Sequence, residues 1–308
     1  MTNRLAKFIS ANGPLLEAAL ERWLPLSQKA GAEQFNQALH YAMFPGGKRM
    51  RPMLTLIGAK LAGGDTQTAL PAACAMEFLH TSSLIFDDLP AMDDAEIRRG
   101  RATVHVVYGE SMATLAALAL FNQSYALLAR SSRHHASLTQ TLIAEAAECI
   151  GANGMIGGQA IDLALKSASA GQDALTNRNL KTTTLMRLTM TAGALSCGAT
   201  EACVSALAQY GENLGAAYQV CDDLLDELGE SELIGKPAGQ DERHLRPSFV
   251  AELGIEGAYS LAMSLAEESK SAITRQFGLC PESLLLMDAV DFVIRDVEKF
   301  GLNAQMAA

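Results

Sequence analysis

Two groups of aspartates are the residues of this chain best suited to chemistry. The first group, Asp87, Asp88, Asp93 and Asp94, places four carboxylates within eight residues. Pro90 disfavours helical geometry at the residue before it, so a helix that reaches Asp88 should end there. A helix C-terminus is unfavourable to anions, and a hard divalent cation shared with a substrate phosphate would supply the missing positive charge. The spacing therefore predicts a Mg2+–phosphate site.

A second acidic group lies far along the chain and contains Asp222, Asp223 and Asp226. Asp222 and Asp226 are four residues apart, so on a helix they share one face and repel each other. Either group alone could be an acidic surface turn, because aspartate is common in turns. Two such groups in one chain instead indicate two opposing sides of a metal site.

The basic residues are concentrated in two short segments, GGKRMR at 46–51 and RRGR at 98–101. The formal net charge of −10 argues against a nucleic-acid-binding surface, which would need a basic face. Gly46 and Gly47 allow a bound anion to approach the backbone closely. The first segment is not a P-loop, because it lacks the GxxxxGK[ST] pattern. Both segments suit a small polyanion.

The elements that must position these residues are helices. Hydrophobic residues make up 49% of the chain and aromatic residues 6%, with Ala and Leu dominant, a composition that favours packed helices over sheets. Apolar spacing and helix breakers predict one all-α domain over residues 1–308, with a mobile loop at 229–245. The expected helices cover 14–24, 34–44, 53–61, 68–88, 110–129, 137–150, a short segment from 157, 180–195, 201–228, 257–277 and 281–300.

The six cysteines show no CxxC pair and no zinc-ligand spacing, and they lie inside apolar runs. We therefore expect reduced core cysteines in a cytoplasmic protein. The N-terminus lacks the apolar core of a signal peptide. No apolar run reaches about 18–20 residues without a polar interruption, so we expect no membrane span.

Five segments of the chain resemble the motifs of the trans-prenyl diphosphate synthases, in that family's order and spacing over nearly the whole chain. They read GGKRMRP, HTSSLIFDDLPAMDDAEIRRG, GGQAIDL, KTTTL and YQVCDDLLD…GK. The resemblance implies a helical bundle around a deep central cavity (the isoprenoid synthase type I fold), a homodimer, and three Mg2+ ions per active site. It also implies condensation of isopentenyl diphosphate with dimethylallyl, geranyl or farnesyl diphosphate by ionisation, condensation and elimination.

The resemblance assigns roles by position. It implies that Asp87 and Asp93 hold Mg2+ with support from Asp88, and that Asp222, Asp223 and Asp226 hold a third ion. The residues it makes catalytic are Asp87, Asp88, Asp93, Arg98, Lys181 and Asp222. The implied contacts of the allylic diphosphate are Arg98, Lys181, Thr182, Gln219, Lys236 and, more weakly, Arg246, whereas Lys48, Arg51, His80 and Arg99 match the isopentenyl diphosphate pocket.

Product length is predicted from residues that precede the first aspartate. Farnesyl-making bacterial relatives commonly carry an aromatic residue five positions before it, where this chain has the small Ser82, followed by Ser83. The next bulky side chain on that face is Phe78, one turn or about 5.4 Å deeper. This depth favours a twenty-carbon product, geranylgeranyl diphosphate, with farnesyl diphosphate as the alternative. Small serines could instead serve only close helix packing.

The sequence departs from the family's pattern at three places. Arg246 replaces the usual lysine, which keeps the charge but changes its reach. Thr183 stands where the family's KTG motif has glycine, and Ala95 replaces a common acidic residue. None of these changes removes a predicted metal ligand.

Two other classes of protein share some of these features. A terpene cyclase would also ionise an allylic diphosphate but needs no second diphosphate pocket, whereas Lys48, Arg51, His80 and Arg99 provide one. A non-catalytic partner subunit would normally have lost an aspartate group, and both groups are intact here.

Overall fold

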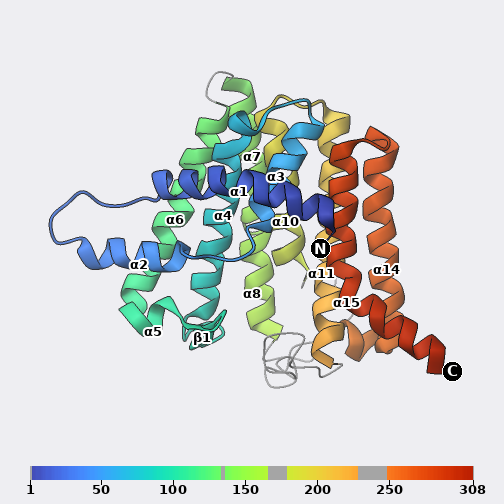
Figure 1. Cartoon of the computed structure of the whole chain (residues 1–308). Helices are drawn as coiled ribbons and strands as arrows, with labels where there is room; N and C mark the ends of the chain where they lie inside the picture. Colours follow the sequence, from blue (N-terminus) through green and yellow to red (C-terminus); the bar gives the residue numbers. More distant parts are fainter. Residues whose placement is uncertain (1, 133–135, 166–178, 228–247, 308) are drawn as a thin grey trace. The chain divides into compact units, whose positions relative to one another are not determined.

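The computed structural model describes residues 2–132, 136–165, 179–227 and 248–307, which are almost entirely helical (Figure 1). This confirms the predicted all-α class. The helices are α1 (Asn3–Trp23), α2 (Glu33–Met43), α3 (Met50–Leu61), α4 (Thr66–Asp88), α5 (Val104–Tyr108), α6 (Glu110–Ser131), α7 (Ala136–Ile150), α8 (Met155–Leu165), α10 (Leu180–Ser196), α11 (Glu201–Glu227), α14 (Phe249–Phe277) and α15 (Pro281–Ala307).

Several elements differ from the sequence prediction, among them α15, which ends at Ala307 rather than near residue 300, and α5, which was not predicted. Helix α1 begins at Asn3 and accommodates Pro14 in its interior. Helix α14 begins at Phe249 rather than near residue 257, because Gly254, with φ 70°, breaks the helical backbone only locally. The sequence also gave no sign of a small antiparallel hairpin, in which β1 (Ile97–Arg98) pairs with β2 (Arg101–Ala102).

The chain divides into two compact units. The N-terminal unit comprises Ile9–Ile143 and Ala192–Gly198, and the C-terminal unit comprises Met1–Phe8, Ala144–Thr191 and Ala199–Ala308. The prediction of a single domain over the whole chain stays a prediction.

Helix α4 is the core helix of the N-terminal unit and packs against α3 and α6. It is apolar on nearly every side, which suits a helix surrounded by others. Its N-terminus is capped by Asp65, whose side chain accepts the Thr68 N–H at 2.8 Å. Its last residue is Asp88, and Leu89 is extended (ψ 150°) before Pro90. The helix therefore ends where the sequence predicted.

Helices α11, α14 and α15 pack against one another in the C-terminal unit (Figure 1). Tyr210 of α11 is fully buried, and its hydroxyl donates to the Leu286 carbonyl of α15 at 2.8 Å. Gly211 and Gly215 face α10, where an added Cβ would lie 2.9 Å from the Cα atoms of Arg187 and Thr183. Only glycine permits this approach of two helix backbones.

Two of the described helices are long and apolar enough to cross a bilayer. The most apolar part of α4 is 78% buried in the protein, as expected of a core helix, and that of α6 is 39% buried. Length and composition alone are weak evidence for a span, and the expectation of none stays a prediction.

All six cysteines are free, which agrees with the sequence interpretation. Cys74, Cys149, Cys203 and Cys221 are buried, and Cys197 and Cys280 are partly buried. Burial raises the pKa of the Cys149 and Cys221 thiols to about 12, so these thiols stay protonated near neutral pH.

Candidate active site

The end of α4 folds back on itself and brings its aspartates together. Asp87 and Asp88 are 7% and 4% exposed. The N–H groups of Asp93 and Ala95 donate to the carbonyls of Asp87 and Asp88 at 2.9 and 3.2 Å. These bonds satisfy carbonyls that a helix end leaves unpaired. They also fix the Asp93 backbone beside Asp87, so the structure brings together the residues of the first predicted metal group.

Arg98 of β1 supplies the counter-charge for one of these buried carboxylates. Its Nη2 lies 2.7 Å from Asp88 Oδ1, and its Nε lies 2.8 and 2.9 Å from the two carboxylate oxygens. Burial raises the pKa of Asp88, and the hydrogen bond and charge of Arg98 oppose that rise. Arg98, predicted as a diphosphate contact, is therefore held by an aspartate of the predicted metal group.

Arg99 lies in the turn of the β1–β2 hairpin and has an unusual backbone conformation. Arg99 and Gly100 form the two-residue turn, with φ 54° and 73°. Positive φ at both positions is the geometry of a type I′ turn, which normally uses Asn or Gly rather than arginine. A Cβ added at Gly47 would lie 2.6 Å from Arg99 Nη1, so the two basic segments of the sequence meet here.

Of the predicted isopentenyl diphosphate residues, Arg99 lies at this contact and Arg51 and His80 meet each other. Arg51 Nη1 lies 3.3 Å from His80 Nε2, which joins the start of α3 to α4. A cavity of about 130 Å3 is lined by Arg49, Arg98, Arg99 and Arg101 together with Asp88, among others, whereas Arg51 and His80 are not among its lining residues. Lys48 lies in the chain between Gly47 and Arg51. A small cavity walled by several guanidinium groups is suited to a phosphate-bearing ligand.

The C-terminal unit carries the second predicted set. The Thr182 hydroxyl of α10 donates to Gln219 Oε1 of α11 at 3.1 Å. A Cβ added at Gly158 of α8 would lie 2.5 Å from the Lys181 backbone nitrogen. The glycine-rich GGQAIDL segment thus lets α8 pack directly against the start of α10, which carries Lys181 and Thr182.

The three aspartates of α11 differ in their surroundings. Asp223 is 3% exposed, and its Oδ2 accepts the backbone N–H of Phe249 at 2.8 Å. Asp222 and Asp226 are less buried. Asp223, predicted with them as a metal ligand, holds the first residue of α14 against α11.

No three His, Cys, Asp or Glu side chains within the described ranges come close enough to hold a metal ion by themselves. Mg2+ typically uses one or two carboxylates and completes its shell with water and substrate phosphate. The oxygen donors of Asp87 and Asp93 fit that mode of binding. The number of ions stays a prediction.

Of the residues predicted to set product length, Ser82 and Phe78 lie in the core of the N-terminal unit and Ser83 is partly buried. Ser82 is 1% exposed and its hydroxyl donates to the Ala117 carbonyl of α6 at 2.9 Å. Ser83 donates to the His80 carbonyl of its own helix at 2.9 Å. Phe78 is completely buried. The small Ser82 therefore brings α4 and α6 close together, and its role in product length stays a prediction.

Two predicted diphosphate contacts, Lys236 and Arg246, lie outside the described residues, as does the predicted loop at 229–245.

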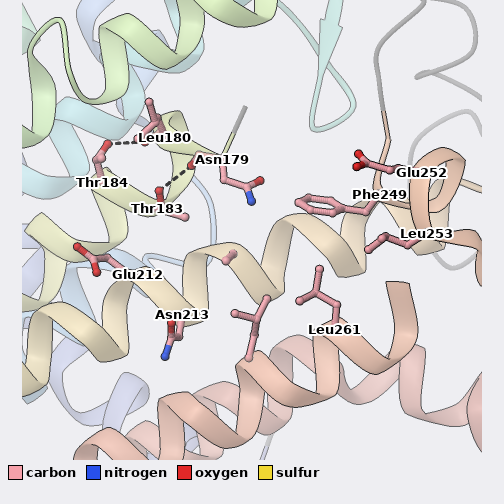
Figure 2. A pocket seen from close by; sticks show the side chains of 12 residues that line it. Asn179, Leu180, Thr183, Thr184, Glu212, Asn213, Phe249, Glu252, Leu253 and Leu261 are labelled. Atoms are coloured by element: carbon pink, nitrogen blue, oxygen red, sulfur yellow. Dashed lines mark hydrogen bonds between the residues drawn. The ribbon is translucent and has the colours of Figure 1, made fainter. Parts of the chain in front are cut away.

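A second, larger cavity of about 510 Å3 lies among α10, α11 and α14 (Figure 2). Phe249, Leu253 and Leu261 of α14 form part of its apolar wall. Thr183 also lines it, and its hydroxyl donates to the Asn179 carbonyl at 2.8 Å. This cavity was not predicted, because it arises from the packing of three helices that are separate in the sequence.

Comparison with known proteins shows the family and the fold of this chain. Residues 32–275 match the polyprenyl synthetase family. The chain is 38% identical over 243 residues to a geranylgeranyl diphosphate synthase of Cyanophora paradoxa, covering 77% of this chain and 80% of that protein. It is 34% identical over 296 residues to a dimethylallyltranstransferase of Fischerella ambigua, covering 95% and 84%.

A crystal structure of an FPP/GFPP synthase from Zymomonas mobilis is similar, with a TM-score of 0.84, 27% identity, and coverage of 96% of this chain and 100% of that one. The architecture is therefore the all-α isoprenoid synthase fold. The chain belongs to the polyprenyl synthetase family, which confirms the resemblance seen in its motifs.

Replacing Asp223 with alanine tests its role in the site. If the carboxylate mainly holds α14, Asp223→Ala leaves the buried Phe249 N–H unpaired and destabilises the protein by about 1–3 kcal/mol. A lower Tm in Mg2+-free buffer would check this. Glu227→Ala is the control, since this exposed acidic residue in the last turn of α11 opposes the helix dipole and its loss should leave Tm unchanged or higher. An unchanged Tm for Asp223→Ala would contradict the assignment.

Proposed function

We propose that this chain is a Mg2+-dependent prenyltransferase that condenses isopentenyl diphosphate with an allylic diphosphate. The observation that carries the proposal lies within the N-terminal unit. There, the carboxylates of Asp87 and Asp88 end a buried helix beside a cavity walled by arginines. The acidic group is suited to a metal-bound diphosphate, and the cationic pocket beside it is suited to a second diphosphate. This pair of sites fits a reaction between two diphosphates. The names of the relatives from Cyanophora and Fischerella support it.

The chemistry explains why these residue types are needed. An allylic diphosphate ionises when its diphosphate leaves, and charge that builds on the leaving group must be neutralised. The resemblance implies that Asp87 and Asp93 would hold Mg2+ and that Asp222, Asp223 and Asp226 would hold a further ion, and Mg2+ would act on the leaving group as a Lewis acid. Lys181 and Thr182 at the start of α10 would bind the leaving diphosphate.

The second substrate would be held by residues of the N-terminal unit. Lys48, Arg51, His80 and Arg99 would bind the diphosphate of isopentenyl diphosphate, so that its double bond can meet the allylic cation. Apolar walls would exclude water from that cation. No side-chain nucleophile is required, and the departing diphosphate can accept the proton that is lost in the elimination.

An assay with purified protein tests the reaction and its metal dependence. Isopentenyl diphosphate together with dimethylallyl, geranyl or farnesyl diphosphate should yield a longer all-trans diphosphate and inorganic diphosphate, and EDTA should abolish the yield. Asp87→Asn should lower kcat by on the order of 100-fold or more. Consumption of an allylic diphosphate alone, with release of a hydrocarbon, would indicate a terpene cyclase instead. Inactivity with every pair would indicate a non-catalytic subunit.

The proposed product is geranylgeranyl diphosphate, with farnesyl diphosphate as the alternative. Ser82 is small, and Phe78 follows one turn deeper along α4. Ser82→Tyr should shift the product from twenty carbons to fifteen, as measured by chromatography of the dephosphorylated prenols. Ser82→Ala is the control, because it removes the hydrogen bond to Ala117 without adding bulk, and should keep the twenty-carbon product. An unchanged product for Ser82→Tyr would refute the assignment.

The proposed assembly is a homodimer. Leu115 and Leu118 of α6 share one face and are each 51% exposed, and α5, which packs against α6, exposes Val106 and Val107. Large apolar side chains exposed on neighbouring helices in this way are typical of an interface.

Sedimentation velocity tests this assembly. The wild type should sediment with twice the monomer mass, and Leu118→Glu should shift it to the monomer. Leu279→Glu, at a residue 75% exposed in the C-terminal unit, should stay dimeric. A monomeric wild type, or a dimeric Leu118→Glu variant, would contradict the proposed interface.

A further inference from the structure

Arg49 stands between two predicted ligands of isopentenyl diphosphate, yet its side chain turns into the protein. It is 6% exposed, and although it lines the small cavity beside Asp88, its guanidinium is engaged by acceptor groups of the protein. Its backbone is left-handed, with φ 52° and ψ 33°, at the position that caps α3. Such a conformation is unfavourable for a long side chain and persists only where the surroundings hold it.

The guanidinium of Arg49 is held on every side. Its Nη1 donates to Glu77 Oε1 at 2.7 Å, and its Nε donates to Glu17 Oε1 at 2.8 Å. Its Nη2 donates to the Met43 carbonyl at 2.8 Å. Burial opposes the charge of Arg49, but the carboxylates of Glu17 and Glu77 outweigh it and raise the pKa of the guanidinium.

The chain after α2 wraps around this guanidinium. A Cβ added at Gly46 would collide with the Arg49 guanidinium, so the loop backbone lies directly on it. The next residue, Gly47, lies against Arg99 in the same way. The shape of the loop that carries Lys48 is therefore set by Arg49 on one side and by Arg99 on the other.

The ion pair with Glu77 also fixes α3 against α4 where the predicted pocket forms. Glu77 precedes His80 by three residues on α4, and Arg49 precedes Arg51 by two residues at the start of α3. Arg51 and His80 are themselves 3.3 Å apart. A shift of the Arg49–Glu77 contact would displace both members of that pair.

Backbone strain marks the same region. Among the described residues, the non-glycine residues with positive φ are Arg49, Asp94 and Arg99. All three adjoin the predicted diphosphate and metal groups. Strain of this kind gathers where a site must be held in one geometry.

We infer that Arg49 is a positioning residue for the isopentenyl diphosphate pocket. Through Glu77, Glu17 and the Met43 carbonyl it holds the Gly46–Lys48 loop and the start of α3, so that Lys48 and Arg51 are presented beside His80 and Arg99. This role rests on the proposed function, which assigns that pocket to isopentenyl diphosphate.

Arg49→Lys is the decisive variant, because one ammonium group cannot span both carboxylates and the Met43 carbonyl as a guanidinium fork does. We expect the KM for isopentenyl diphosphate to rise about tenfold, with kcat and the KM for the allylic substrate changed less than about twofold. Calorimetric titration with isopentenyl diphosphate alone should show the same loss of affinity.

Arg4→Met controls for a general loss of stability. Arg4 forms a two-point ion pair with the buried Asp288, at 2.8 and 3.0 Å, in the C-terminal unit. This variant should lower Tm while leaving both KM values unchanged. If Arg49→Lys behaves in the same way, with a lower Tm and an unchanged affinity for isopentenyl diphosphate, the inference is overturned.

Glu17→Gln covers the case in which Arg49→Lys does not fold. Glu17 is the outer member of the group, with a side chain 41% exposed, so its change to glutamine should be tolerated. It should raise the KM for isopentenyl diphosphate by about threefold, and an unchanged KM would overturn the inference. A wild type that binds isopentenyl diphosphate but does not condense it would contradict the proposed function and not the role of Arg49.

Discussion

A buried carboxylate at the C-terminal end of a helix needs a positive charge beside it, and Asp88 meets this condition through Arg98. The site on the N-terminal unit depends on this ion pair. It ties the β1–β2 hairpin to the end of α4, and the hairpin in turn carries Arg99 to the loop at Gly47. One electrostatic requirement thus connects the predicted metal group to the predicted diphosphate pocket.

The same physical rule acts a second time around Arg49. Its guanidinium is buried among apolar helices and must be satisfied by Glu77, Glu17 and a backbone carbonyl. In a unit whose core is built from Ala, Leu and Met, these polar contacts are directional and the apolar ones are not. The charged groups therefore decide the conformation of the loops, while apolar burial supplies the bulk of the stability.

In the C-terminal unit, glycine and a single aspartate have comparable roles. Gly158 and Gly215 let α8 and α11 approach the backbone of α10, and this closeness allows Thr182 to reach Gln219. The Asp223 carboxylate accepts a hydrogen bond from the first N–H of α14. Three neighbouring aspartates in one motif thus have different surroundings, although their side chains are chemically identical.

The sequence by itself determined the helical class, most helix boundaries, the end of α4 at Asp88 and the family, because apolar periodicity, proline and linear motifs are local properties. Tertiary structure decided that Arg98 pairs with Asp88, that Arg49 turns inward to Glu77, and that Asp223 binds the start of α14. Each of these choices joins residues of different elements, and a pattern of residue types along the chain does not say which cation reaches which carboxylate. The partners follow only from the packing that brings distant segments together and removes the water that would otherwise satisfy them.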